Sequence, residues 1–298
     1  MRRDIEFPSK GLKCRGWLYA ADLSAINQRA PGIIMAHGFS VVKEMFHLSE
    51  YAERFVDAGF ITLVFDFRFL GESEGEPRGQ IISNEQLEDY RNAITWLSQQ
   101  PEVDANRIGI WGTSYSGGHV LHLAAFDRRI KAAVAQVPTV NPWRQIMHRS
   151  GRDGLDRLMG MLIADRIERF NTGAVNYMKV VAPKGELAAL STPDAFEAMT
   201  RSGALAPNWI NKVTMESLES YVEYQPTASI ERISPTPLLM ALAERDAVIP
   251  VELQRAAFER AGEPKELKTF PCGHFEIYDN KHRSEAVNNM VQWYSKYL

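Results

Sequence analysis

Short apolar runs bounded by turn residues alternate with helical patterns along most of this 298-residue chain. Most of these runs lack the apolar–polar alternation of a half-exposed strand, which is typical of strands buried on both faces. Parallel buried strands need crossover connections, and the segments between the runs supply helices for them. We interpret the following runs as strands: 32–38, 60–68, 107–112, 130–138, 237–244 and 266–271. The sequence therefore predicts an α/β fold in which helices flank a mostly parallel central sheet.

Two regions depart from this alternation. Near the start, apolar and polar residues alternate on both sides of Gly11, which predicts an opening hairpin. Further along, helical segments punctuated by Gly and Pro follow one another with no strand-like run. We therefore divide the chain into a core of residues 1–140 and 230–298 and a helical insertion of residues 141–229, which we expect to form a lid.

The charge balance narrows the class of partner. The chain has 34 basic and 37 acidic residues, which give a formal net charge of −3. It therefore lacks the basic excess that nucleic acid or an anionic membrane attracts. No apolar stretch approaches the roughly 20 residues of a membrane-spanning helix. We expect a small-molecule partner, and neither nucleic acid nor a membrane.

The cysteines and the first residues predict the compartment. Cys14 and Cys272 are too few for the disulfide framework of a small secreted protein. Acidic residues and a proline stand where a signal peptide has its apolar core. We therefore expect a cytoplasmic protein. Residues 6–11 (EFPSKG) provide an exposed strand edge, which offers one route to a homodimer.

One predicted strand ends in a turn of unusual composition. Residues 108–121 (IGIWGTSYSGGHVL) run from an apolar strand through Gly112 and Ser114 into a helical pattern. A strand, a sharp turn and a helix around a central serine are typical of a nucleophile elbow. The close approach of strand and helix demands small residues two positions before and after the nucleophile. Gly112 meets this demand, and Ser116 replaces the usual second glycine. We predict Ser114 as the nucleophile and Ser116 as its weaker competitor.

A serine nucleophile needs a base that removes its proton and an acid that orients the base. Asp246 and His274 each follow a predicted strand in the second half of the chain. We predict His274 as the base and Asp246 as the acid. Asp66, which follows another strand, is the rival acid, and we expect it to shape the rim of the site with Arg68 as its ion-pair partner.

The residues after the first buried strand complete the predicted site. In the sequence His37-Gly38-Phe39, we expect the backbone N–H of Phe39 to converge with that of Tyr115 on the substrate oxygen. Such donors stabilise an oxyanion, and losing one of them raises the barrier by about 3 kcal/mol. We expect His37 to hold this turn by hydrogen bonding.

These elements together resemble the α/β-hydrolase superfamily of serine hydrolases over nearly the whole chain. The motifs are HGFS, FDFRFLGESEGEPRG, GTSYSGGHVL and AERDAVIP followed by PCGHF. They are similar to the branch with dienelactone-hydrolase-like and acyl-peptidase-like hydrolases, which includes fungal polyketide transferases and related bacterial esterases. Dienelactone hydrolases carry a cysteine at the elbow, where this chain has Ser114. The resemblance implies the α/β-hydrolase fold and an esterase, thioesterase or acyl-transfer activity without a cofactor.

The predicted lid is rich in methionine and aromatic residues, which form adaptable apolar walls. We therefore expect a hydrophobic acyl group, with Trp143, Met147 and His148 in the substrate pocket. His119 and His122 lie three residues apart on the helix after the elbow, but no third ligand accompanies them, so we expect no metal.

We therefore expect an enzyme that cleaves a carboxylic ester or thioester through a Ser-His-Asp catalytic triad and an acyl-enzyme. An acyltransferase would use the same residues to move a polyketide-like acyl group to an alcohol. A peptidase-like hydrolase is a further alternative, although the sequence shows no obvious acidic pair for a free amino terminus. A binding module with this fold would need a broken triad.

Overall fold

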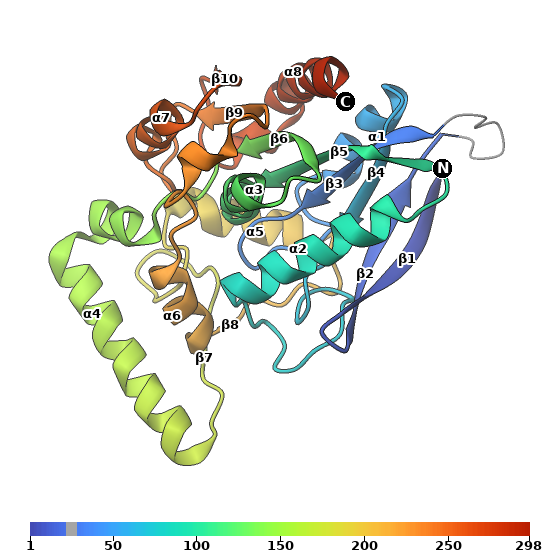
Figure 1. The fold of residues 1–298 in the computed structure, drawn as a ribbon. Coiled ribbons are helices and arrows are strands. Elements are labelled where there is room, and N and C mark those ends of the chain that lie inside the picture. The colour runs from blue at the N-terminus through green and yellow to red at the C-terminus, as the bar shows by residue number, and fades with distance from the viewer. Residues whose placement is uncertain (22–28) are drawn as a thin grey trace.

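The predicted strands assemble into one eight-stranded sheet in the computed structural model, which describes residues 1–21 and 29–298 (Figure 1). The strands of this sheet are β1 (Arg2–Ser9), β2 (Leu12–Tyr19), β3 (Ala30–Ala36), β4 (Ile61–Phe65), β5 (Val103–Thr113), β6 (Ile130–Gln136), β9 (Leu238–Ala243) and β10 (Lys265–Phe270). Their order in space is β1-β2-β4-β3-β5-β6-β9-β10. β2 pairs antiparallel with β1 and β4, and the other neighbouring pairs are parallel. The predicted α/β fold with a mostly parallel sheet is confirmed.

Helices cover both faces of this sheet, which is why β4 and β9 are buried at every position. The helices of the core are α1 (Leu48–Asp57), α2 (Ser83–Ser98), α3 (Tyr115–Phe126), α7 (Val251–Arg260) and α8 (Asn280–Tyr297). In Figure 1, α2 and α3 lie in front of the sheet and α1 lies behind it. The buried residues of α1 are Leu48, Tyr51, Ala52 and Phe55, whose spacing is that of one helical face.

The amino-terminal hairpin forms one edge of the sheet. β1 and β2 are joined at Gly11, whose φ of 82° is one that glycine adopts without strain. The predicted hairpin is therefore confirmed. β1 has a neighbour in the sheet on one side only, and most of its residues are exposed. A homodimer through this edge stays a prediction.

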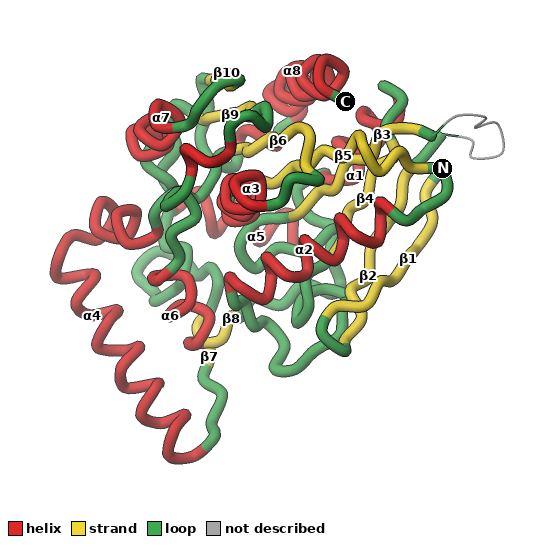
Figure 2. Tube along the Cα trace, in the orientation of Figure 1, coloured by secondary structure: helices red, strands yellow, loops and turns green. Residues whose placement is uncertain are grey.

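Three helices occupy the insertion between β6 and β9, namely α4 (Pro142–Thr172), α5 (Pro193–Gly203) and α6 (Met215–Glu223). Figure 2 shows the far part of α4 projecting from the body of the molecule. α4 is bent at Gly151, where a φ of 65° and a ψ of −175° interrupt the helix. Short 3-10 turns, η2 (Ile230–Ile233) and η3 (Glu276–Tyr278), precede β9 and α8.

The prediction that this insertion contains no strand was wrong. β7 (Tyr177–Met178) and β8 (Val213–Thr214) pair antiparallel within it. Each strand is two residues long, so neither produces an alternation that a sequence pattern could show.

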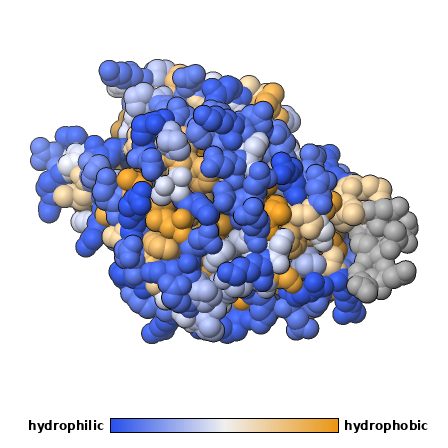
Figure 3. All heavy atoms as spheres, turned by 90° about the horizontal axis from the view of Figure 1, so that it is seen from above, coloured by the Kyte–Doolittle hydropathy of each residue, from blue (hydrophilic) through white to orange (hydrophobic). Residues whose placement is uncertain are grey.

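The hydrophobic core lies between the sheet and its helices and is continuous with the buried side of the insertion. The face shown in Figure 3 is mostly hydrophilic, and hydrophobic residues gather on it in small separate groups. Within residues 1–21 and 29–298, no helix combines the length and the apolar character needed to cross a membrane.

Candidate active site

Ser114 lies in the sharp turn between β5 and α3, at the carboxyl end of a central strand. Its φ of 56° and ψ of −115° are unusual for a residue with a side chain. Backbone hydrogen bonds hold this conformation. The Ser114 N–H donates to the Gln136 carbonyl oxygen at 2.8 Å, and the Thr139 N–H donates to the Ser114 carbonyl oxygen at 2.8 Å. The strained turn is the one expected of a nucleophile elbow.

Small residues allow this turn to close. A Cβ on Gly112 would lie 2.2 Å from the Ser116 carbonyl oxygen, so glycine is required there. Ser116 is fully buried, and its hydroxyl donates to the Ala36 carbonyl oxygen of β3 at 2.5 Å. The Ser116 side chain therefore ties the elbow to the neighbouring strand, whereas the Ser114 side chain faces His274.

His274 bridges Ser114 and Asp246. Its Nε2 lies 3.1 Å from Ser114 Oγ, and its Nδ1 lies 2.8 Å from Asp246 Oδ2. The three residues meet because β5, β9 and β10 run parallel and end at the same edge of the sheet. A histidine in this position can accept the serine proton while the carboxylate orients its ring.

Asp246 has several donors besides His274. Its Oδ1 accepts from the backbone N–H of Val248 at 2.9 Å and of Ile249 at 2.7 Å. Its Oδ2 accepts from the side-chain amide of Gln254 at 3.2 Å. These bonds fix the carboxylate, so that Oδ2 points at the imidazole.

Gly38 brings the turn after β3 against the elbow. A Cβ at Gly38 would lie 3.2 Å from Ser114 Cβ and 3.7 Å from Ser114 Oγ. Phe39 follows directly in this turn. Tyr115 is the first residue of α3, where backbone N–H groups have no acceptor within the helix. The two backbone donors expected from the sequence, Phe39 and Tyr115, therefore belong to the two turns that meet at Ser114.

His37 holds the turn after β3 in place by a hydrogen bond. Its Nδ1 donates to the Gly38 carbonyl oxygen at 3.1 Å, which is the kind of bond expected of it. Burial lowers the pKa of His37 to about 4, although its bond to Gly38 opposes the shift. The ring is therefore neutral near neutral pH and holds the backbone without adding charge to the site.

The rival acid, Asp66, belongs to a separate buried cluster around Lys43. The Lys43 ammonium donates to Asp66 Oδ2 at 2.9 Å, to Glu72 Oε2 at 2.7 Å and to Glu44 Oε1 at 3.0 Å. The three carboxylates are close enough together to bind a metal ion. The Lys43 ammonium lies among these three carboxylates and supplies one positive charge to the cluster.

Both expectations about the surroundings of Asp66 were wrong. Asp66 is fully buried instead of lying at the rim of the site. Arg68 pairs with Asp89 of α2, since Arg68 Nε donates to Asp89 Oδ1 at 2.5 Å. Lys43 and Asp89 each lie more than 20 residues from their partners, as the separations of 23 and 21 show, so no local spacing revealed these pairs.

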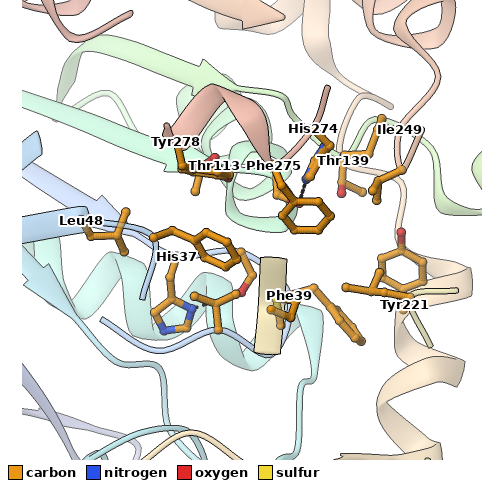
Figure 4. Close-up of a pocket in the computed structure, with 17 residues that line it drawn as sticks. His37, Phe39, Leu48, Thr113, Thr139, Tyr221, Ile249, His274, Phe275 and Tyr278 are labelled. Carbon is orange, nitrogen blue, oxygen red and sulfur yellow. Dashed lines mark hydrogen bonds between the residues drawn. The ribbon is translucent and has the colours of Figure 1, made fainter. Parts of the chain in front are cut away.

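A small cavity lies over Ser114, between the core and the insertion (Figure 4). Its volume of about 30 Å³ accommodates one or two water molecules. The insertion contributes Leu190, Met199 and Tyr221 to its wall, and Figure 4 shows Tyr221 beside the space that His274 faces. An acyl group of more than a few atoms therefore requires these side chains to move.

The prediction that Trp143, Met147 and His148 line the substrate pocket was wrong. Trp143 and His148 are exposed, and Met147 packs partly buried against the core. None of the three lines the cavity over Ser114. The rotation of α4 buries Gln145 and Ile146 and leaves Trp143 and His148 exposed.

His119 is a core residue with both ring nitrogens bonded. Gln86 Oε1 lies 3.0 Å from Nε2 and can only accept, so Nε2 carries the proton. Nδ1 then accepts from the Tyr224 hydroxyl at 2.8 Å. Burial lowers the pKa of His119 to about 3. Neither ring nitrogen of His119 is therefore free to bind a metal ion together with His122.

Sequence reasoning missed Tyr221 and Lys43. Tyr221 lies beside Leu218 and Val222, which form the buried face of α6, so the helical period could have placed it near the core. Lys43 follows a strand end in a loop, and a lone lysine there gives no pattern that predicts burial.

Residues 20–210 match the family model described as X-Pro dipeptidyl-peptidase (S15 family). Three curated relatives match most of the chain. The quorum-quenching protein AidA of Acinetobacter baumannii is 33% identical, over 97% of this chain and 93% of the relative. The polyketide transferase grgF of a Penicillium species is 32% identical, over 89% and 86%. The thiohydrolase aneE of Aspergillus aculeatus is 32% identical, over 90% and 84%.

A solved structure shows the same architecture. The alpha/beta hydrolase GrgF from Penicillium sp. sh18 has a TM-score of 0.84 and 28% identity, with 100% of this chain and 99% of the other covered. The α/β-hydrolase fold expected from the motifs is therefore confirmed.

Proposed function

The chain belongs to the X-Pro dipeptidyl-peptidase (S15) family and is an enzyme of the hydrolase type, and we propose that it cleaves carboxylic esters or thioesters with a hydrophobic acyl group. One observation carries this proposal. Ser114 Oγ, His274 and Asp246 form a continuous chain of contacts, at 3.1 Å and 2.8 Å, beneath an apolar cavity.

In the proposed mechanism, Ser114 Oγ attacks the carbonyl carbon as His274 Nε2 takes the hydroxyl proton. The carbonyl oxygen becomes an oxyanion, which the backbone N–H groups of Phe39 and Tyr115 bind. Collapse of this intermediate expels the alcohol or thiol, which receives the proton from His274, and leaves an acyl-enzyme. Water, deprotonated by His274, then releases the acid and restores Ser114. Asp246 keeps the imidazole oriented throughout.

The insertion serves as a lid in this proposal. Leu190, Met199 and Tyr221 come from it and close the wall of the cavity. The cavity over Ser114 has room for one or two water molecules, so in this proposal the entry of an acyl ester requires a lid movement. The side chains of Leu190, Met199 and Tyr221 are largely apolar and fit a hydrocarbon chain better than a charged peptide.

An acyltransferase is the second candidate, because a relative covering most of the chain is named a polyketide transferase. The chemistry differs only in the acceptor, since an alcohol in place of water attacks the acyl-enzyme. Product partitioning between acid and ester at increasing alcohol concentration separates the two.

A dipeptidyl-peptidase, which the family description names, needs a carboxylate for the amino terminus of its substrate. Among the described residues that line the cavity over Ser114 there is no Asp or Glu. We therefore expect no release of 4-nitroaniline from a Gly-Pro 4-nitroanilide by an enzyme that hydrolyses 4-nitrophenyl esters.

The compartment we propose is the cytoplasm, which Cys14 and Cys272 support because both thiols are free and buried. Burial raises the pKa of the Cys272 thiol to about 12, which keeps it protonated and unreactive.

The decisive experiment is intact-mass analysis after incubation with a fluorophosphonate probe. The parent protein should gain one adduct, and Ser114→Ala should gain none. Ser116→Ala is the matched control, because it removes the other serine hydroxyl of the elbow and should still be labelled. A folded parent without an adduct, or an adduct that persists in Ser114→Ala, would overturn the proposal.

A further inference from the structure

A second cavity lies within the insertion, next to the one over Ser114. Its volume is about 250 Å³, much larger than the 30 Å³ of the first. Tyr221 lines both cavities, and Ala189 lines the second while its neighbour Leu190 lines the first. Tyr221 and the segment of chain at Ala189 and Leu190 therefore separate the two cavities.

The wall of the second cavity combines apolar residues with two arginines. Its apolar residues include Ile146, Leu158, Met161, Met178, Leu218 and Val222. Two arginines also line it: Arg149, which is half-buried, and Arg157, which is exposed. Among the described residues of its wall, the one carboxylate is that of Glu186, which accepts from Lys179 Nζ at 2.9 Å.

Neither arginine has a carboxylate within 4.0 Å among the described residues, whereas Arg152 and Arg169 of the same helix do. Arg149 Nε is buried and bonds to nothing in the described part of the chain. A buried guanidinium nitrogen without an acceptor is costly, and an anion would satisfy it.

The bend at Gly151 explains why the two arginines share one cavity. Arg149 belongs to the segment of α4 before the bend, and Arg157 belongs to the segment after it. In a straight helix, residues eight apart are separated by about 12 Å along the axis and by about 80° around it. The bend instead lets the two segments form adjoining walls.

Arg149 also lies close to Tyr221. Burial raises the pKa of the Tyr221 phenol, and the positive charge of Arg149 opposes this rise. The cationic end of the second cavity is therefore near the ring that separates it from Ser114.

We propose that this second cavity binds an anionic end of the substrate, a carboxylate or a phosphate, with Arg149 and Arg157, and an adjoining hydrocarbon segment with its methionine and leucine wall. Movement of Tyr221 joins the two cavities, so that the ester or thioester carbonyl reaches Ser114 while the anion stays on the arginines. This inference rests on the proposed function and adds the class of substrate.

Two arms of one experiment distinguish the source of the anion. In the acyl arm, 4-nitrophenyl octanoate is compared with the 4-nitrophenyl monoester of octanedioic acid. In the leaving-group arm, the octanoyl thioester of N-acetylcysteamine is compared with that of 4′-phosphopantetheine. We expect kcat/KM to be at least tenfold higher for the anionic member of one arm, and to fall with added NaCl.

The variants Arg149→Gln, Arg157→Gln and their combination should abolish this preference and leave kcat/KM for the neutral member within about twofold. Arg157→Lys should retain part of it. Arg152→Gln is the matched control, because Arg152 is on the same helix, pairs with Asp156 and has a side chain 73% exposed. It should change neither member.

Equal kcat/KM for anionic and neutral members in both arms would overturn the inference, as would equal losses on both members in the double variant. The proposed function is tested separately by hydrolysis of 4-nitrophenyl octanoate and by labelling of Ser114. An enzyme that passes these two tests but shows no anion preference refutes only the anion subsite.

Discussion

The ring of Tyr221 lies edge-on to the ring of Phe39, with the ring centroids 5.3 Å apart. This contact joins α6 of the insertion to the turn after β3, whose backbone we propose as half of the oxyanion hole. The Tyr221 hydroxyl donates to Gln145 Oε1 of α4 at 3.2 Å. Any lid movement that carries α4 and α6 away therefore also takes the ring of Tyr221 off Phe39, which keeps its contact with the ring of Tyr115.

The first prediction separates the ring of Tyr221 from its hydroxyl. Tyr221→Ala removes a contact worth about 1 kcal/mol and loosens the Phe39 turn, so kcat/KM for 4-nitrophenyl esters should fall about tenfold. Tyr221→Phe keeps the ring and should stay within about threefold of the parent. Steady-state kinetics with thermal unfolding curves would check this. Equal losses in the two variants would show that the hydroxyl, and not the ring, matters.

The second prediction compares two buried carboxylates. Asp246→Asn should lower kcat by about 10³-fold or more, because a neutral amide no longer stabilises the His274 cation or fixes its tautomer. Asp66→Asn should instead lower the free energy of unfolding by about 1–3 kcal/mol, since Lys43 keeps its other two acceptors. Its kcat should stay within about threefold of the parent.

Urea unfolding and single-turnover kinetics on both variants would measure these effects. A catalytic collapse in Asp66→Asn, with Asp246→Asn unaffected, would return Asp66 to the role of the acid.

The residues of the candidate site that follow strands could be predicted from the sequence, and those that close the cavity could not. Ser114, His274 and Asp246 each stand just after an apolar run, and the carboxyl ends of parallel strands meet at one edge. The substrate wall depends on how α4 and α6 rotate against the core. Apolar residues are so frequent in the insertion that more than one helix face could have covered the site. From the sequence alone, Trp143 was therefore as good a candidate for the wall of the cavity as Tyr221.

Pairs that are distant in sequence were beyond prediction for the same reason. Asp66 and Arg68 are two residues apart, which made an ion pair between them plausible. In the structure, each is neutralised by a residue from a different loop or helix, Lys43 and Asp89, because both sites are closed to water. Tertiary packing determines which residues form such pairs, and the spacing of two residues in the sequence carries no information about that packing.

The third prediction concerns the elbow glycine. Gly112→Ala should destabilise the fold by at least about 3 kcal/mol or prevent folding, because the new Cβ would lie 2.2 Å from the Ser116 carbonyl oxygen. Gly160→Ala is the matched control in α4, where a Cβ meets nothing within 4 Å, and it should stabilise the protein by about 0.5–1 kcal/mol. Soluble yield and urea midpoints of both variants would test this. A Gly112→Ala protein as stable and as readily labelled by a fluorophosphonate as the parent would contradict the elbow geometry.

The last prediction is a pH dependence of stability that arises outside the site. His119 is buried, and burial lowers its pKa from 6.5 to about 3. Between these values the unfolded chain binds a proton on His119 and the folded chain does not, so the free energy of unfolding falls as the pH falls. The slope reaches about 1.4 kcal/mol per pH unit for this one group.

His119→Gln should be less stable than the parent at pH 7.5, because it loses the bond with Tyr224 or Gln86. The difference between the two proteins should change by about 2 kcal/mol in favour of the variant between pH 6.5 and pH 4.5, since the glutamine does not titrate. Urea unfolding at several pH values would measure this difference. A difference that stays constant over that range would mean that the folded protein accepts a proton on His119 as readily as the unfolded chain does. It would contradict a neutral His119 that is bonded to Tyr224 and Gln86.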